Sequence, residues 1–564
     1  MLTSCKDVHL IKDLGVVGIA AAYPIIQQNR SIELEYFLDY ADLDTDLYDL
    51  VGEVSLNWYK KSDHQEFDIG SVLHRRLLVE FSSVLRYYLA LDRCVKIHRK
   101  VVISCKAPSS LLLVSKHFPD NVEFFFSDNE FDKHITASPR RGLVAGVRIR
   151  NLLSKCLRVL QVPFFNQLKN KVLIFNDWTY RKVKNSNCLN INTFNPMKSF
   201  CLRQGKEYLL HAECVFPEEI EDFKISPNIK EVLSRFALPS NMKRDLIELF
   251  TKVVQQEYCD NRSKFIETYC AYQEMFDYYQ PAMVISPGYS TAEYQILHSI
   301  AKSKQTPTMF IQDGFMFFLD RYLFSCDKGK AADYFAVMGK SVERLYIEAF
   351  KGSNIKTVRI HPPVVSTHKS LKSGVESESA IILFPYGFSF SPSCRWDKRY
   401  QYVVDVAGIL LSLGYKDIKV KMKDGFEAFD RETENQLMKE LLDQEGYFDV
   451  ELIFGSLFDH LHNASFVVGQ ISTAIIETIY HKIPYYVYEP YSLGLSDATL
   501  KGSILDIKII SRDVHELRKS ILKQNIVKLN KREIFGGDVL DSIDYENIIQ
   551  SFHNKTSSTD QFFQ

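Results

Sequence analysis

Apolar segments bounded by turn residues alternate with helix-like patterns along most of the chain. This alternation is typical of parallel α/β architecture, in which a helix follows each strand and packs against the sheet. In the first two thirds of the chain, strands are expected near residues 7–13, 32–40, 100–107, 122–128, 171–177, 282–288, 307–314, 333–339 and 356–363. Helices are expected over residues 15–26, 70–91, 110–118 and within 228–279.

The polar stretch THKSLKSGVESES, at residues 367–379, interrupts this pattern and has the Gly, Ser and Lys content of an inter-domain linker. After it, strands are expected near 380–387, 417–424, 449–454, 465–469 and 483–488. We therefore predict an α/β protein with two Rossmann-like doubly wound domains facing a cleft. The N-terminal domain would cover residues 1–366 with helical insertions, the C-terminal domain 380–511, and a helical tail 512–564.

Composition narrows the class of protein. With 564 residues and 46% hydrophobic content, the chain is too long for a single core. Its 69 Lys and Arg residues balance 70 Asp and Glu, which argues against a nucleic-acid partner. The 11 cysteines show no metal-ligand spacing and fit reduced thiols. No apolar run reaches the ~18–20 residues of a membrane span. These features together favour a cytoplasmic protein.

Polar residues follow the first two expected strands of the C-terminal domain. The first loop contains Ser389, Ser391 and Arg395, and the next strand ends with Lys421 and Lys423. Ligands of doubly wound sheets bind at the carboxyl ends of strands, so we predict that these residues contact the phosphates of a bound ligand. The alternatives are a capping loop for the serines and a solvated strand face for the lysines.

A third polar site follows the strand at 465–469, in the sequence GQISTAIIETIYHKIPYYVY. This segment resembles the donor-binding segment of GT-B glycosyltransferases, in which a strand, a small-residue turn, a helix carrying Glu and a Pro precede the next strand. The resemblance implies that Glu477 binds the ribose of the donor and that Ser472 and Thr473 contact its phosphate, with Gln470 beside them. Helix capping and core packing are the alternative interpretation of the same residues.

The N-terminal domain is similar, over residues 280–314 and 332–346, to bacterial surface-polysaccharide transferases. Those relatives often have a Gln-His-Gly turn where this chain has Asp313 between Gln and Gly. The resemblance makes Asp313 the candidate general base, provided that burial raises its pKa. His361, close to the linker, is a second catalytic candidate. Either residue also fits a structural role, Asp313 in a turn and His361 as a satisfied histidine.

Three further residues of this domain, Ser286, Tyr289 and Ser290, follow an expected strand and are candidates for contacting the acceptor. Turn formation explains them equally well. The acidic residues Asp42, Asp44 and Asp46 do not predict a metal site, because Leu47 stands where a calcium loop needs Gly.

The segment 139–171 carries eight basic residues and no acidic one, interleaved with Leu, Val and Phe. This pattern predicts a basic amphipathic surface that binds anionic lipid. Packing against a partner helix or the core is the alternative. Peripheral attachment to the inner face of the cytoplasmic membrane would follow from the lipid interpretation.

The resemblance implies a glycosyltransferase that uses neither a metal nor another cofactor. It would move a sugar from a nucleotide-sugar donor to a growing bacterial surface glycan, such as capsule or lipopolysaccharide, on an oligosaccharide or lipid-linked acceptor. Cytidine, uridine and guanosine donors all stay open. A nucleotide-sugar 2-epimerase, a polyol-phosphate transferase and a non-catalytic glycan-binding scaffold of the same fold are the alternatives.

Overall fold

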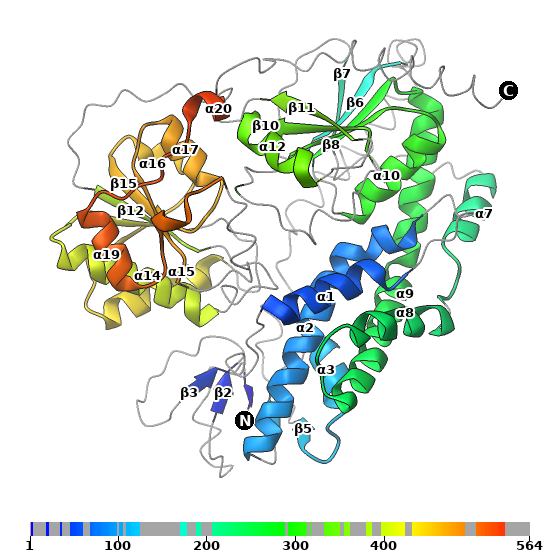
Figure 1. Ribbon diagram of the computed structural model, residues 1–564, viewed down its shortest axis with the longest axis horizontal. Helices are drawn as coiled ribbons and strands as arrows, with labels where there is room; N and C mark the ends of the chain where they lie inside the picture. The colour runs from blue at the N-terminus through cyan, green and yellow to red at the C-terminus, as the bar shows by residue number, and fades with distance from the viewer. Residues whose placement is uncertain are drawn as a thin grey trace.

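The computed structural model contains three parallel β-sheets with helices packed around them (Figure 1). It describes residues 2–3, 19–21, 34–36, 45–59, 68–98, 101–104, 109–124, 170–176, 188–192, 206–220, 222–287, 291–312, 317, 332–349, 355–360, 379–385, 396–422, 431–490 and 504–535. The α/β fold class with Rossmann-like parallel sheets, expected from the pattern of apolar segments, is confirmed.

The C-terminal sheet has six parallel strands in the order β14-β13-β12-β15-β16-β17. These are β12 (Ser379–Leu383), β13 (Ile418–Lys421), β14 (Glu451–Ile453), β15 (Ala464–Gly469), β16 (Tyr485–Tyr488) and β17 (Ile510–Ser511). Counted along the chain, this is the 3-2-1-4-5-6 order of dinucleotide-binding folds, which reverses direction between β12 and β15. Ligands of such sheets bind at that reversal, beyond the carboxyl ends of the strands.

Helices connect these strands or follow the last of them, in the yellow to red part of Figure 1. They are α14 (Trp396–Ser412), α15 (Arg431–Gln444), α16 (Phe458–Leu461), α17 (Ala474–Tyr480) and α19 (Val514–Leu522). Because helices cover the sheet, the strand β16 is buried at all four positions, as expected for a parallel strand with both faces covered.

The middle sheet also has six parallel strands, in the order β11-β10-β9-β8-β6-β7. These are β6 (Val172–Asn176), β7 (Cys188–Asn192), β8 (Met283–Pro287), β9 (Thr308–Ile311), β10 (Tyr334–Met338) and β11 (Lys356–Ile360). Its neighbouring helices include α10 (Ala292–Ser303) and α12 (Gly339–Ala349). Each of β6 and β8 to β11 lies within an expected strand.

A helical layer packs against the middle sheet. It contains α1 (Thr45–Asn57), α2 (Ile69–His98), α7 (Lys206–Val215), α8 (Asp222–Ser234) and the 40-residue α9 (Ser240–Tyr279). One apolar core joins these helices to Leu173 and Phe175 of β6 and Val284 of β8. In this core, the rings of Phe81 and Phe250 lie 4.4 Å apart.

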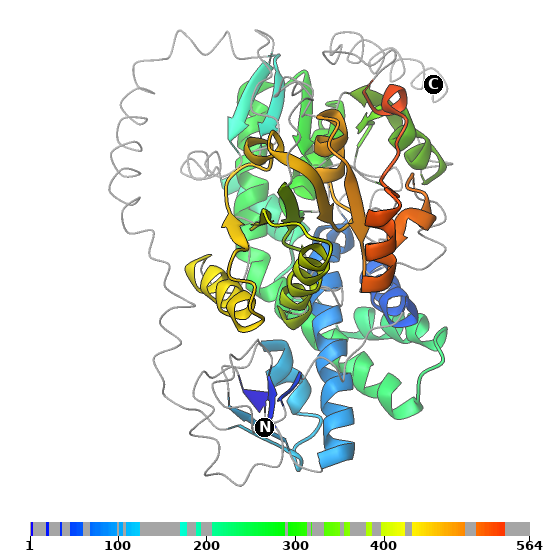
Figure 2. The same cartoon turned by 90° about the vertical axis from the view of Figure 1, so that its left-hand side faces the viewer.

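The N-terminal sheet is a third unit that the two-domain prediction did not include. Its order is β3-β2-β1-β4-β5, with β1 (Leu2–Thr3), β2 (Ile19–Ala21), β3 (Leu34–Tyr36), β4 (Val101–Ser104) and β5 (Val122–Phe124), and α3 (Ser109–Ser115) between the last two. Figure 2 shows it beside the end of α2. Residues 1–366 therefore contain two sheets.

One expected element of this region is wrong. Residues 15–26 were expected to form a helix, but Ile19–Ala21 is a strand that pairs with both β1 and β3. The short apolar run that follows Gly15 and Gly18 has no clear period, so tertiary pairing decides its conformation. The strand expected at 7–13 lies outside the described residues.

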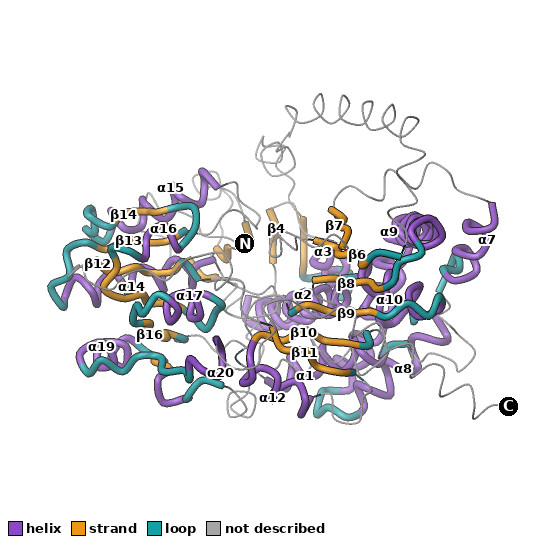
Figure 3. The backbone as a smooth tube through the Cα atoms, turned by 90° about the horizontal axis from the view of Figure 1, so that it is seen from above, coloured by secondary structure: helices purple, strands orange, loops and turns teal. Residues whose placement is uncertain are grey.

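The chain beyond residue 511 returns to the middle sheet. There α20 (Lys531–Phe535) packs against α12, and Figure 3 shows it between the two domains. One apolar core includes Ile381 of the C-terminal sheet, Ile285 of the middle sheet and Ile534 of α20. Of the predicted linker, only Ser379 is described, and it begins β12. Within the described residues, no helix combines the length and apolarity that crossing a membrane requires.

Candidate functional site

Polar side chains gather at the carboxyl edge of the C-terminal sheet. Lys421 ends β13, and Gly469 ends β15. A turn of four residues, 470–473, then leads to α17, which carries Glu477 in its first turn. Because β13 and β15 flank β12 on opposite sides, these residues surround the point at which the strand order reverses.

Glu477 and Lys421 influence each other electrostatically. Burial raises the pKa of the Glu477 carboxyl to about 7, and the nearby positive charge of Lys421 works in the opposite direction. Lys421 Nζ also donates a hydrogen bond to the carbonyl of Met422 at 2.5 Å. By contrast, the neighbouring Lys419 pairs with Asp417 at 3.5 Å. The two residues predicted to bind donor ribose and phosphate thus lie at the same edge of the sheet and interact electrostatically.

The turn before α17 is held by Tyr485 of β16. The Tyr485 hydroxyl donates to the carbonyl of Gln470 at 2.6 Å, and the Ser472 side chain hydrogen-bonds the same hydroxyl. Burial raises the pKa of Tyr485, while the bond with Ser472 lowers it. Thr473 is exposed at the N-cap of α17 and makes no capping hydrogen bond with its side chain. Contacts of Ser472 and Thr473 with phosphate stay a prediction.

Gly469 makes room for this arrangement. A Cβ atom at this position would lie 2.2 Å from the Tyr485 hydroxyl oxygen and 2.9 Å from Cδ1 of Leu383. Both distances are shorter than real side-chain contacts, so only glycine fits between β15 and the Tyr485 side chain.

Glu489 is a member of the site that the sequence analysis missed. It follows β16, is 1% exposed, and accepts a hydrogen bond from the backbone N–H of Ile471 at 2.6 Å. Burial raises the pKa of Glu489 to about 8, while the bonds from Ile471 and Gln470 and the charge of Arg512 lower it. The carboxyl group is therefore largely protonated at neutral pH. Its position directly after a strand was the available signal.

Gln470 contacts the same carboxyl group. Its Nε2 donates to Glu489 Oε2 at 3.4 Å, while the buried Gln470 Oε1 has no hydrogen-bond partner among the described residues.

In the middle sheet, Ser286 ends up in the interior. Its hydroxyl lies 2.8 Å from Nε2 of His298, both side chains are fully buried, and the His298 ring stacks on Phe310 at 4.1 Å. Ser286 in this conformation therefore lies beneath any surface that an acceptor would contact. Gln312 follows β9, and its side chain accepts a hydrogen bond from the Met338 N–H at 2.8 Å.

Several predicted site residues lie outside the described residues and stay predictions. They are Asp313, His361, Ser389, Ser391, Arg395, Lys423, Tyr289 and Ser290, together with the basic segment 139–171 except for its last two residues. Among the described side chains, no group of three or more His, Cys, Asp or Glu residues is arranged to hold a metal ion.

Neither a known protein-family model nor a curated protein sequence matches the chain. Solved structures show similarity of fold. UDP-N-acetylglucosamine 2-epimerase from Rickettsia bellii is 13% identical over 70% of this chain and 96% of its own, with a TM-score of 0.35. The glycotransferase of kitacinnamycin is 10% identical over 58% and 85%, with a TM-score of 0.31.

A variant of the wall teichoic acid polymerase TagF is 12% identical over 52% of this chain and 86% of its own, with a TM-score of 0.25. The three structures are of a nucleotide-sugar epimerase, a glycotransferase and a wall teichoic acid polymerase. Similarities of this size assign no activity.

Proposed function

We propose that this protein is a glycosyltransferase that binds a nucleotide-sugar donor at the carboxyl edge of its C-terminal sheet. The observation that carries this proposal is that Glu477 and Lys421, which interact electrostatically, both lie at the carboxyl edge of the sheet beside the reversal of strand order. At this point a carboxylate can bind the ribose hydroxyls, and an ammonium group can bind the phosphates, of a nucleoside diphosphate or monophosphate.

Each residue then has a chemical role. Ionised Glu477 accepts hydrogen bonds from the two hydroxyls of the donor ribose. Lys421 places a positive charge where the phosphate leaves with the electrons of the broken glycosidic bond. Ser472, Thr473 and Gln470 border the same space, with Lys423, Arg395, Ser389 and Ser391 as further donor contacts. Stabilisation by these groups replaces the charge that a metal supplies in other transferases.

The acceptor would bind on the middle sheet, with Asp313 or His361 removing the proton from its attacking hydroxyl. Asp313 directly follows Gln312, whose side chain and backbone are hydrogen-bonded to β10. We further propose that the acceptor belongs to a bacterial surface glycan and that residues 139–171 hold the enzyme at the inner membrane face.

Donor binding is tested by calorimetric titration with UDP, CMP, CDP and GDP. One of them should bind the wild type, and Glu477→Gln should weaken that binding at least tenfold, because an amide cannot accept hydrogen bonds from both ribose hydroxyls. Glu451→Gln, at an exposed position of β14, is the matched control and should bind normally. If none of the four nucleotides binds the wild type, the proposed donor site is wrong.

The same affinity should rise with pH through about 7, because only the ionised Glu477 accepts both hydroxyls. Titrations at pH 6 and pH 8 measure this change. The variant Glu477→Gln should lose most of the pH dependence. Turnover assays then use nucleotide-sugars that contain the nucleotide found to bind. They distinguish sugar transfer from epimerisation at C2, from polyol-phosphate transfer, and from binding without reaction.

A further inference from the structure

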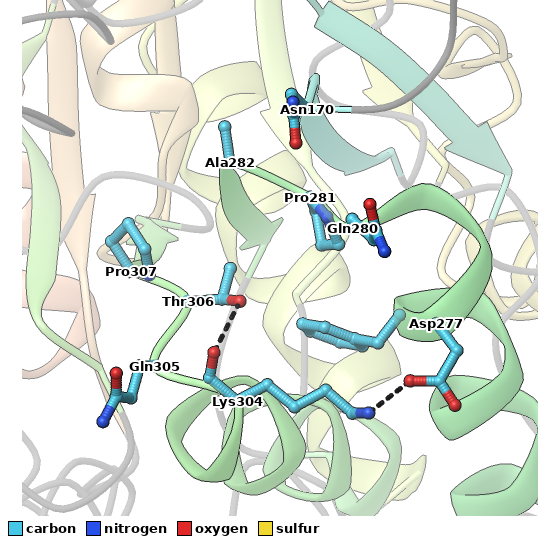
Figure 4. A pocket seen from close by; sticks show the side chains of 10 residues that line it. Asn170, Asp277, Gln280, Pro281, Ala282, Lys304, Gln305, Thr306 and Pro307 are labelled. Atoms are coloured by element: carbon cyan, nitrogen blue, oxygen red, sulfur yellow. Dashed lines mark hydrogen bonds and ion pairs between the residues drawn. The ribbon is translucent and has the colours of Figure 1, made fainter. Parts of the chain in front are cut away.

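A pocket of about 720 Å³ opens at the amino edge of the middle sheet (Figure 4). Its walls are the end of α9, the residues just before β6 and β8, and the turn between α10 and β9. This edge is opposite the carboxyl edge of the middle sheet, to which the acceptor candidates belong, and the donor candidates belong to the C-terminal sheet. The volume lies within the range of sites that bind small molecules.

Three residues that line the pocket have a left-handed backbone conformation. They are Asn170, Gln280 and Gln305, with φ angles of 58°, 45° and 54°. Gln280 ends α9, where its N–H bonds the carbonyl of Phe276 at 2.8 Å. Gln305 lies one residue beyond Lys304, which is the C-cap of α10. Glycine is the usual residue at such helix ends, because it adopts this conformation without steric cost.

The side chains at these three positions are exposed amides. Within the described part of the chain, none of the three amides makes a hydrogen bond. Each offers one acceptor oxygen and two donor hydrogens. The chain therefore places three exposed amide groups around one pocket, and at the two glutamine positions glycine would be less strained.

The charges that line this pocket cancel. Lys304 pairs with Asp277, as the dashed line in Figure 4 shows, and Asp277 also accepts a hydrogen bond from Tyr208. Phe276, Pro281 and Pro307 supply apolar surface. Neutral amides beside apolar rings suit a ligand that combines hydroxyl groups with C–H faces. A phosphate or carboxylate ligand would meet a cation already neutralised by its carboxylate.

We propose that this pocket binds an uncharged oligosaccharide at a site separate from the donor site. Asn170, Gln280 and Gln305 would hydrogen-bond the sugar hydroxyls, and the proline and phenylalanine rings would contact the C–H faces. For a glycosyltransferase, such a site would hold a glycan chain at a distance from its reacting end.

The test is saturation-transfer NMR without nucleotide, with maltopentaose, cellotetraose, laminaripentaose and tetra-N-acetylchitotetraose as probes at millimolar concentration. At least one should receive saturation from the wild type. Gln280→Gly and Gln305→Gly should each weaken that binding at least tenfold while leaving the melting temperature equal or higher. Absence of transfer to every probe, or unchanged affinity in both variants, overturns the proposal.

Two further variants complete the design. Gln524→Gly is the matched control. Gln524 is an exposed glutamine with a φ of 51°, it follows α19 as Gln305 follows α10, and it lies away from this pocket. It should keep full glycan binding. Glu477→Gln should also bind the oligosaccharide with wild-type affinity, whether or not its nucleotide binding is weakened. Loss of glycan binding in Glu477→Gln would place the sugar in the donor site and overturn the proposal.

Discussion

At the residue scale, the carboxyl group of Glu489 links β16 to the turn that precedes α17. It is buried, and its oxygen accepts the Ile471 N–H, so the turn that borders the donor site already has one backbone donor occupied. In the sequence, Glu489 is a polar residue directly after an expected strand, and many exposed turns show the same pattern. Its burial depends on packing between β16 and the segment at 470–471, and only the folded structure contains that information.

The raised pKa of the Glu489 carboxyl should make the unfolding free energy depend on pH. Because the pKa of Glu489 is about 8 in the folded protein and near 4.5 otherwise, the native state binds the extra proton between these values. Stability from Glu489 is therefore fully present below pH 4.5 and is lost as pH rises through about 8. A pKa that differs by one between the folded and unfolded protein changes the unfolding free energy by about 1.4 kcal/mol.

Urea denaturation at pH 5.5, 7 and 8.5 measures this loss. In Glu489→Gln, the amide stays neutral, so the remaining decline should come from Glu477 and should end about one pH unit above its pKa of about 7. The exposed Glu451→Gln should retain the wild-type profile. A variant Glu489→Gln with an unchanged decline between pH 7 and 8.5 would show that Glu489 is already ionised in the native protein.

At the element scale, most strands of the two large sheets were predictable because buried parallel strands are short apolar runs between turn residues, but Cys188–Asn192 and Ile510–Ser511 were not predicted. The strand order was not predictable from this pattern, since pairing such as β12 with β15 joins segments that are distant in sequence. The same limit explains the error at Ile19–Ala21. Glu477 was predictable from its place on the helix after β15, whereas its proximity to Lys421 needed the sheet.

The junction of β15 with α17 gives a prediction at this scale. Gly469→Ala places a Cβ atom against the Tyr485 hydroxyl, so the hydrogen bond to Gln470 should break and unfolding free energy should fall by about 1–3 kcal/mol. Adding Tyr485→Phe removes the clashing oxygen. Urea denaturation of both single variants and the double variant should then show a loss smaller than the sum of the two. Additive losses would mean that the two residues do not interact.

At the scale of the whole molecule, α20 connects the C-terminal chain to the middle sheet. Ile534 is 1% exposed in the shared apolar core, and a Cβ on Gly339 would lie 2.7 Å from the Glu533 carbonyl oxygen. Glu533 also accepts a hydrogen bond from Ser341 at 2.7 Å and pairs with Arg344. On its other side, the ring of Phe535 lies 5.5 Å from Tyr480 of α17.

This contact predicts that apolar packing, more than the ion pair, couples the two domains. Ile534→Ala should lower unfolding free energy by about 2–5 kcal/mol, because it leaves a cavity between them. Glu533→Gln should cost less than about 1 kcal/mol, since Arg344 is 59% exposed and such pairs contribute little. Urea denaturation followed by fluorescence and by circular dichroism compares the two variants. Because Ile534 also lies in the core shared by the two domains, Ile534→Ala should make the unfolding transition seen by fluorescence differ from the one seen by circular dichroism. An equal loss of unfolding free energy in both variants would show that the ion pair couples the domains instead.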